Sequence, residues 1–286
     1  MKSDLLKHIS SVTPTLSKNQ QRVASYLMSN WETALYESSM VIAKKVGVSQ
    51  STVVRTVTNL GYKSFLEFQS ELQQLLQEQF SSTKRIEQVS IDQEGQSVEQ
   101  RISKVFLQHQ KNLNMTLCHL ESEQIMRAAD LIWRGKRIFL LGLRTSSVLS
   151  QYFGLHLSMI RENVIILSSD YNLLENIRTV TKEDVLVVFS FTRYYRNTIE
   201  AAYFARDLKC TIIGVTDSIA APLTGIADMV FHVPVISMHY SNSYVAVFAL
   251  IDVLLNTIGT NNKVAARKAL QFMEEGFERF NMFLKT

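Results

Sequence analysis

The chain has 286 residues, of which 46% are hydrophobic and 20% are charged, a composition that is ordinary for a globular protein and leaves room for two domains. Its formal net charge of +4 allows contact with nucleic acid but does not establish it. Lys2, Asp4 and Lys7 interrupt the apolar residues at the N-terminus, and Asp252 and Asn256 interrupt the longest apolar segment. We therefore expect neither a signal peptide nor a membrane span, and we predict a cytoplasmic protein.

The two cysteines, Cys118 and Cys210, are far apart in the sequence and lack the spacing of a metal site. Both lie in apolar surroundings, which predicts reduced thiols in the core of a cytosolic protein. The sequence therefore predicts no metal and no cofactor.

Three segments follow one another along the chain. Residues 1–76 have helical spacing, as in Val23 and Leu27, and no strand pattern interrupts them. Residues 77–96 are mostly polar and predict a linker. Residues 97–286 form the predicted second domain, which begins with two further helices and then changes to alternating strands and helices.

The first domain contains a predicted pair of helices joined by a tight turn. Gly47 suits the left-handed position that ends a helix, and Ser49 is a favourable N-cap for the next one. The second helix, residues 50–60, buries its branched residues and leaves polar and basic side chains outside. These side chains predict contacts with base edges and phosphates of DNA from Ser49, Gln50, Ser51, Thr52, Arg55 and Thr56, with Lys44, Lys45 and Lys63 nearby. The alternative is a helical hairpin that serves only as a packing unit.

The motif S-x-x-x-I-A-x-x-x-G-V-S-x-S-T-V-x-R-x-x-x-x-L-G-Y-x-S-F, which begins at Ser38 and ends at Phe65, resembles the N-terminal domain of the RpiR family of bacterial transcription regulators. The match is long and specific, and it implies a DNA-binding helix-turn-helix domain. The chain departs from the family after Arg55, where an aromatic residue is common and Thr56 stands instead.

From residue 137 onward, short apolar runs rich in branched residues alternate with helical patterns. The runs predict strands at 138–143, 164–167, 185–191, 211–216 and 229–233. The other patterns predict helices at 147–161, 173–180, 197–209, 242–258 and 262–284. Near-continuous apolar strands between helices indicate a parallel sheet with helices on both faces. The predicted fold is therefore an all-α helix-turn-helix domain followed by an α/β domain.

Two loops follow predicted strands at the edge where parallel sheets bind ligands, close to helix N-termini. The first loop is residues 142–147 and the second is residues 190–198. Their hydroxyls and arginines predict an anion-binding site formed by Arg144, Ser146, Ser147, Ser190, Thr192, Arg193, Arg196 and Thr198. For any single hydroxyl a helix cap is the better explanation, but two loops with three arginines favour a binding site.

Residues 125–235 resemble a sugar isomerase (SIS) domain, a fold that binds phosphorylated sugars. The first loop of that family is commonly G-x-G-x-S, and this chain has Gly142 and Ser146 with Arg144 in place of the second glycine. The second loop is commonly S-x-S-G-x-T, and here Arg193 replaces the glycine. The resemblance implies that the ligand is a phosphorylated sugar or another anionic metabolite. Because glycine lets a backbone approach phosphate closely, the arginines imply a different way of holding it.

Together these features predict a transcription regulator that binds a double-stranded DNA operator and is controlled by a metabolite, with no catalysis and no membrane partner. Such proteins usually bind paired half-sites, so we expect a homo-oligomer, dimer or tetramer. The apolar C-terminal helices offer a dimer surface, although burial against their own sheet explains them equally well. One alternative function is a sugar-phosphate isomerase, whose base would come from His156, Glu175, His232 or His239. Another is a metabolite-binding module that acts only through protein contacts.

Overall fold

The computed structural model describes residues 4–35, 37–79 and 82–284. The described residues therefore exclude residues 1–3 and position 36 of the first predicted domain. They also exclude residues 80–81 of the predicted linker and residues 285–286 of the second predicted domain. The chain forms two compact units. The first holds the chain up to Lys104 together with Asp217–Ala221 and Ser237–Asn242, and the second holds the remainder.

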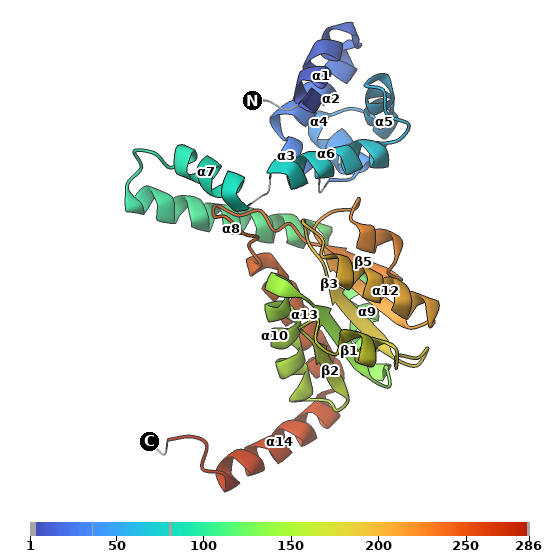
Figure 1. Cartoon of the computed structure of the whole chain (residues 1–286), viewed down its shortest axis with the longest axis vertical. Helices are drawn as coiled ribbons and strands as arrows, with labels where there is room; N and C mark the ends of the chain where they lie inside the picture. Colours follow the sequence, from blue (N-terminus) through green and yellow to red (C-terminus); the bar gives the residue numbers. More distant parts are fainter. Residues whose placement is uncertain (1–3, 36, 80–81, 285–286) are drawn as a thin grey trace. The chain divides into compact units, whose positions relative to one another are not determined.

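The first unit is helical in its N-terminal part (Figure 1). Its elements are α1 (Asp4–Val12), η1 (Thr13–Thr15), α2 (Lys18–Ser29), α3 (Trp31–Ala34), α4 (Ser39–Val46), α5 (Gln50–Asn59), α6 (Phe65–Gln79) and α7 (Ser82–Asp92). Ile42 of α4, Val53 and Val57 of α5 and Phe68 of α6 are all fully buried. This shared core confirms the prediction of an all-helical N-terminal domain.

The predicted linker, residues 77–96, is largely helical where it is described. It takes in the end of α6 and the whole of α7. Within the first unit, Arg85 Nη2 of α7 donates to Asn242 Oδ1 at 3.1 Å. The sequence reasoning missed α7 because its residues are mostly polar. The domain boundaries at 76 and 96 stay a prediction.

The second unit is built around a five-stranded parallel sheet in the order β2-β1-β3-β4-β5 (Figure 1). Its strands are β1 (Ile138–Gly142), β2 (Val164–Leu167), β3 (Val185–Phe189), β4 (Thr211–Thr216) and β5 (Met229–His232). Its helices are α9 (Ser122–Arg134), α10 (Ser147–Ser158), α11 (Leu173–Ile177), α12 (Arg196–Asp207), α13 (Val245–Asn261) and α14 (Lys263–Arg279), with η2 (Arg144–Ser146) and η3 (Pro222–Gly225) as short turns. The helix α8 (Val98–His119) precedes them.

Both faces of the sheet are covered. Ile138 and Leu140 of β1 lie in one core with residues of α9, α10 and α13, whereas Phe139 and Leu141 lie in a second core with α11 and α12. Successive side chains of a strand point to opposite faces, so a strand buried on both sides needs a continuous apolar run. The predicted α/β fold is confirmed, and the predicted strand ends lie within two residues of the observed ones.

The two cysteines differ in burial. Cys210 is buried, but Cys118 is exposed on α8, so the prediction of a core thiol is wrong for Cys118. The buried side of this helix is occupied instead by the polar residues Asn112 and Thr116. No single described helix is long and apolar enough to cross a membrane; α13 and α14 meet that length and composition only as a pair, and the pair is bent by 102°.

An ion pair joins the starts of β1 and β3. Arg137 Nε and Nη2 donate to the two oxygens of Asp184 at 3.1 and 2.7 Å, and the Asp184 residue is only 1% exposed. Burial disfavours the carboxylate, but hydrogen bonds from Arg137 and Thr181 outweigh it and lower the pKa of Asp184. Because the folded-state pKa lies below the unfolded value of about 3.9, the pair stabilises the fold above that pH and the gain is lost as pH falls through the folded pKa.

Replacing Asp184 with asparagine should lower the free energy of unfolding by about 2–3 kcal/mol at pH 7, because Arg137 would lose its partner in a largely buried place. Urea unfolding measures this loss, and the difference from the wild type should shrink near pH 3. The matched control is Glu183→Gln, which removes an exposed carboxylate 2.8 Å from Lys136 and should leave the unfolding midpoint unchanged. Equal losses in both variants would contradict the assignment.

Candidate functional site

The turn between α4 and α5 is closed by Gly47 and Ser49, as the sequence predicted. Ser38 caps α4, and its Oγ accepts the N–H of Val41 at 3.3 Å. Gly47 ends α4 in the left-handed region with φ 72°. Ser49 caps α5, and its Oγ accepts the N–H of Thr52 at 3.2 Å. This geometry fixes the direction in which α5 leaves the turn.

The helix α5 presents an exposed outer face. Gln50, Ser51 and Arg55 are exposed, as the sequence predicted. The sequence reasoning missed Val54 and Thr58, which are also exposed, although Val54 follows Ser51 by three residues and Thr58 follows Arg55 by three, which places them on the same side of the helix. Together these residues offer amide, hydroxyl, guanidinium and methyl groups, which are the groups that recognise base edges in the major groove.

Two predicted DNA contacts lie elsewhere. The prediction that Thr56 belongs to the outer face is wrong, because its side chain is fully buried and its hydroxyl donates to the Thr52 carbonyl at 2.7 Å. Thr56 shares the inner face with Val53, three residues before it. Thr52 is half-buried, and its hydroxyl lies 2.8 Å from that of Ser49. Both hydroxyls therefore contribute to the cap of α5.

The three predicted lysines have different surroundings. Lys44 and Lys63 are exposed. Lys45 forms an ion pair with Glu37, a residue that is only 1% exposed and also accepts the Tyr26 hydroxyl at 2.7 Å. Because Lys45 neutralises a buried carboxylate, it stabilises the fold. Lys44 and Lys63 are the better candidates for contacts with DNA phosphates.

The two predicted ligand loops lie at the carboxyl ends of neighbouring strands. β1 and β3 pair in parallel, with Gly142 opposite Phe189, so residues 142–147 and 190–198 leave the sheet at the same edge. The first loop leads to α10 on one face, and the second leads to α12 on the other. This change of face is the switch point at which open α/β sheets bind ligands.

Two arginines in these loops have a left-handed backbone. The φ angle is 54° at Arg144 and 72° at Arg193, a conformation that costs a residue with a Cβ atom about 1 kcal/mol and that glycine adopts freely. These are the two positions at which the resembled loops carry glycine. The loops thus keep the glycine backbone shape while adding two guanidinium groups. Gly142 is constrained differently, because a Cβ atom there would lie 2.4 Å from the Ser146 carbonyl oxygen.

The predicted ligand-binding side chains fall into a buried and an exposed group. The hydroxyl residues that are buried or half-buried are Ser146, Ser147, Ser190, Thr192 and Thr198. The exposed residues are the three arginines, Arg144, Arg193 and Arg196. Arg144 Cζ lies 5.8 Å from the centre of the Tyr195 ring, so a cation of the first loop lies over the second loop. The two loops together present positive charge around hydroxyl groups.

Two family models match the two parts of this arrangement. A helix-turn-helix domain of the rpiR family matches residues 3–79, and a SIS domain matches residues 131–257. The chain belongs to the RpiR family of transcriptional regulators. Both resemblances seen in the sequence are thereby confirmed, and the residues matched by the SIS model include the two predicted ligand loops.

Curated relatives of this RpiR-family chain share most of its length. It is 27% identical over 220 residues to the HTH-type transcriptional regulator HexR of Escherichia coli K12, covering 75% of this chain and 73% of that protein. It is 25% identical over 237 residues to HexR of Pseudomonas aeruginosa, covering 81% and 79%.

Solved structures share the fold. The sugar isomerase domain of an RpiR transcription factor from Sphaerobacter thermophilus has a TM-score of 0.59 and 25% identity, covering 60% of this chain and 97% of that one. The NanR protein of Vibrio vulnificus, solved in complex with ManNAc-6P, also has a TM-score of 0.59, with 18% identity over 97% of this chain and 99% of that one.

Two residues beside the two predicted ligand loops were missed by the sequence reasoning. The Tyr244 hydroxyl lies 3.0 Å from Thr145 Oγ1 and 3.3 Å from Ser146 Oγ. Asp170 accepts hydrogen bonds from the Tyr195 hydroxyl at 3.1 Å and from Asn197 Nδ2 at 2.8 Å. Both lie far from the loops in sequence, so no local pattern indicates that they belong to the site.

The histidines proposed as possible bases do not gather at the loops. His156 lies in the last turn of α10, at the opposite end of the helix from the first loop, and its Nδ1 is 2.8 Å from the Tyr152 carbonyl oxygen. His232 is at the end of β5, where burial and the charge of His119 lower its pKa to about 4, so it is neutral at pH 7. Among the residues that the structure describes, no group of three or more His, Cys, Asp or Glu could hold a metal ion.

Proposed function

We propose that the SIS domain binds a phosphorylated sugar or a related anionic metabolite between the loops that follow β1 and β3. The observation that carries this proposal is the set of exposed arginines, Arg144, Arg193 and Arg196, beside the buried hydroxyls of Ser146 and Ser190. Guanidinium groups bind phosphate through paired, charge-assisted hydrogen bonds. The N–H groups at the starts of α10 and α12 add to this preference for an anion.

The bound metabolite changes the affinity of the helix-turn-helix domain for its operator. DNA-binding domains of this type use paired half-sites, so the regulator acts in the cytoplasm as a dimer or tetramer on double-stranded DNA, with no membrane partner. A ligand that binds one arrangement of the oligomer better than another shifts the population toward it. Coupling of this kind changes DNA affinity by about 5–150-fold.

The proposal assigns no reaction to the ligand site. Isomerisation of a sugar phosphate needs a general base beside the sugar carbons, and neither residues 142–147 nor residues 190–198 include Asp, Glu or His. The carboxylate beside the second loop, Asp170, already accepts hydrogen bonds from Tyr195 and Asn197. The arginines and hydroxyls of these loops bind and orient an anion. The names of the HexR relatives as transcriptional regulators support the same conclusion.

A thermal-shift screen of the full chain tests the ligand. The panel contains hexose phosphates, N-acetylamino-sugar phosphates and phosphorylated sugar acids, each with its unphosphorylated parent. A true ligand at a hundredfold excess over its Kd should stabilise the chain by about 2.7 kcal/mol, which corresponds to a rise in Tm of roughly 5–10 °C. The unphosphorylated parents should have no effect.

Variants locate the binding. Ser146→Ala and Ser190→Ala should each reduce the shift, whereas Ser158→Ala, which changes an exposed serine at the end of α10, should leave it intact. The ligand should also change the mobility-shift affinity for the operator. If no phosphorylated compound stabilises the chain, or if both loop variants keep the full shift, the site has been assigned wrongly.

A further inference from the structure

The last helix, α14, extends beyond the body of the second unit with little of its surface covered. It follows α13 after a bend of 102°, and Ala266 in its first turn is its buried residue. Farther along, Leu270 is 39% exposed, and Phe272, which the helical repeat places on the opposite side of α14, is 75% exposed. Leu270 therefore leaves apolar surface uncovered on the side of α14 that faces α10 and α13.

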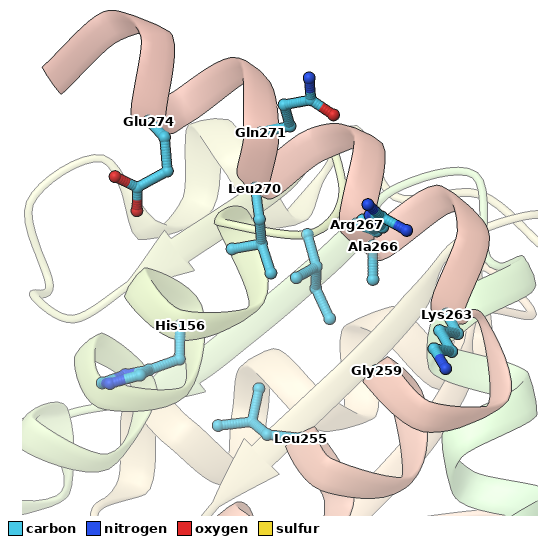
Figure 2. A pocket seen from close by; sticks show the side chains of 10 residues that line it. His156, Leu255, Gly259, Lys263, Ala266, Arg267, Leu270, Gln271 and Glu274 are labelled. Atoms are coloured by element: carbon cyan, nitrogen blue, oxygen red, sulfur yellow. The ribbon is translucent and has the colours of Figure 1, made fainter. Parts of the chain in front are cut away.

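A groove of about 820 Å³ lies between α10, α13 and α14 (Figure 2). Leu255 of α13 and Leu270 of α14 project into it from opposite sides, as Figure 2 shows. Polar and charged side chains also line it, namely His156, Lys263, Arg267, Gln271 and Glu274. The groove therefore combines apolar walls with charges of both signs, which fits an amphipathic helix better than a uniformly apolar ligand.

The charges on the groove side of α14 have an unusual order. Lys263, Arg267, Leu270, Glu274 and Glu278 follow one another at spacings of four, three, four and four residues, which places them on one side of the helix. The basic residues stand at the N-terminal end and the acidic ones at the C-terminal end, the reverse of the order that stabilises an isolated helix. Among the described residues, no ion pair involves any of them.

We propose that the groove is filled by α14 of a second copy of this chain, lying antiparallel to the resident α14 about a two-fold axis beside Leu270. This pairing brings Lys263 opposite the partner's Glu278 and Arg267 opposite the partner's Glu274, and the two-fold axis repeats each contact. The 17 residues of α14 span about 25 Å, which is longer than the stretch from Lys263 to Glu274 that lines the groove. This inference rests on the oligomer of the proposed function and specifies which surface joins its SIS domains.

The test exchanges the charges of α14. Sedimentation velocity of the full chain, without DNA or metabolite, measures the dissociation constant of the dimer for each variant. Combining Glu274→Arg with Glu278→Lys sets like charges against each other and should raise the constant at least about 30-fold. Combining Lys263→Glu with Arg267→Glu should raise it by a similar factor. The chain with all four substitutions should return to within about threefold of the wild type, because every pair is again of opposite sign.

The matched control reverses one basic and one acidic residue on another side of α14. Lys268→Glu with Glu275→Lys changes residues that do not line the groove and should leave the dissociation constant unchanged. Far-UV circular dichroism checks that each variant keeps its helices. A wild-type chain that stays monomeric at high micromolar concentration would overturn the proposal, as would a fourfold variant that folds but does not recover. Because neither DNA nor metabolite is present, either result is independent of the ligand site.

Discussion

Replacing Arg55 with alanine should strongly weaken sequence-specific DNA binding without destabilising the helix-turn-helix domain. Arg55 is exposed on the outer face of α5, whereas the helix is anchored by buried Val53 and Val57. A bidentate contact between arginine and guanine contributes roughly 1–3 kcal/mol. Loss of that contact in both halves of a dimer should lower operator affinity at least about 30-fold, if the two half-sites act additively.

Fluorescence anisotropy with an operator selected from random duplexes, repeated at several salt concentrations, measures the effect. Lys44→Ala should behave differently from Arg55→Ala: it should weaken binding to all sequences alike and reduce the salt slope by about one unit for each copy. Arg178→Ala removes an exposed arginine of the SIS unit and is the control for charge alone. Wild-type affinity in Arg55→Ala would show that α5 is not the recognition helix.

Replacing Arg144 or Arg193 with glycine should strongly lower the affinity for the anionic ligand while leaving the fold intact. Both residues have a left-handed backbone that glycine adopts without strain. The relief of strain and the greater freedom of glycine in the unfolded chain oppose each other, so the Tm without ligand should change little. Each lost charge-assisted hydrogen bond should cost about 1.5–3 kcal/mol, which is roughly 10–150-fold in Kd.

Calorimetric titration of the stabilising metabolite measures this loss. The matched control is Lys209→Gly, because Lys209 is also a cation with a left-handed backbone, with φ 64°, but it follows α12 at the end away from the ligand loops. Unchanged affinity in both loop variants would show that neither arginine contacts the ligand. Tighter binding in either variant would mean that its arginine fills the pocket instead of holding the anion.

The sequence predicted the second unit well because its physical signals are local. Each strand is an apolar run, and the order of runs and helices is enough to indicate a parallel sheet. The adjacency of the two ligand loops was also predictable, since parallel strands end at the same edge. Tyr244 was not predictable in this way. It meets Ser146 across 98 positions of the chain, and only the packing of α13 brings them together.

The errors in the first unit have a different origin. Thr56 was placed outside because it is polar, although its position three residues after Val53 belongs to the inner face. A hydroxyl can be buried there because the Thr52 carbonyl accepts its hydrogen bond. The helix α7 was missed because most of its residues are polar, and no described residue of it is buried.

Because the backbone is left-handed at Arg144 and Arg193, the conformation of each loop does not depend on the side chain at that position. The path of each loop is set by its strand, by the helix that follows and by the close approach of Gly142 to the Ser146 carbonyl. At the two left-handed positions, therefore, a side chain can be added or removed without redrawing the loop. We therefore expect that substitutions at these two positions alone change which anion the proposed site binds, while the sheet stays the same.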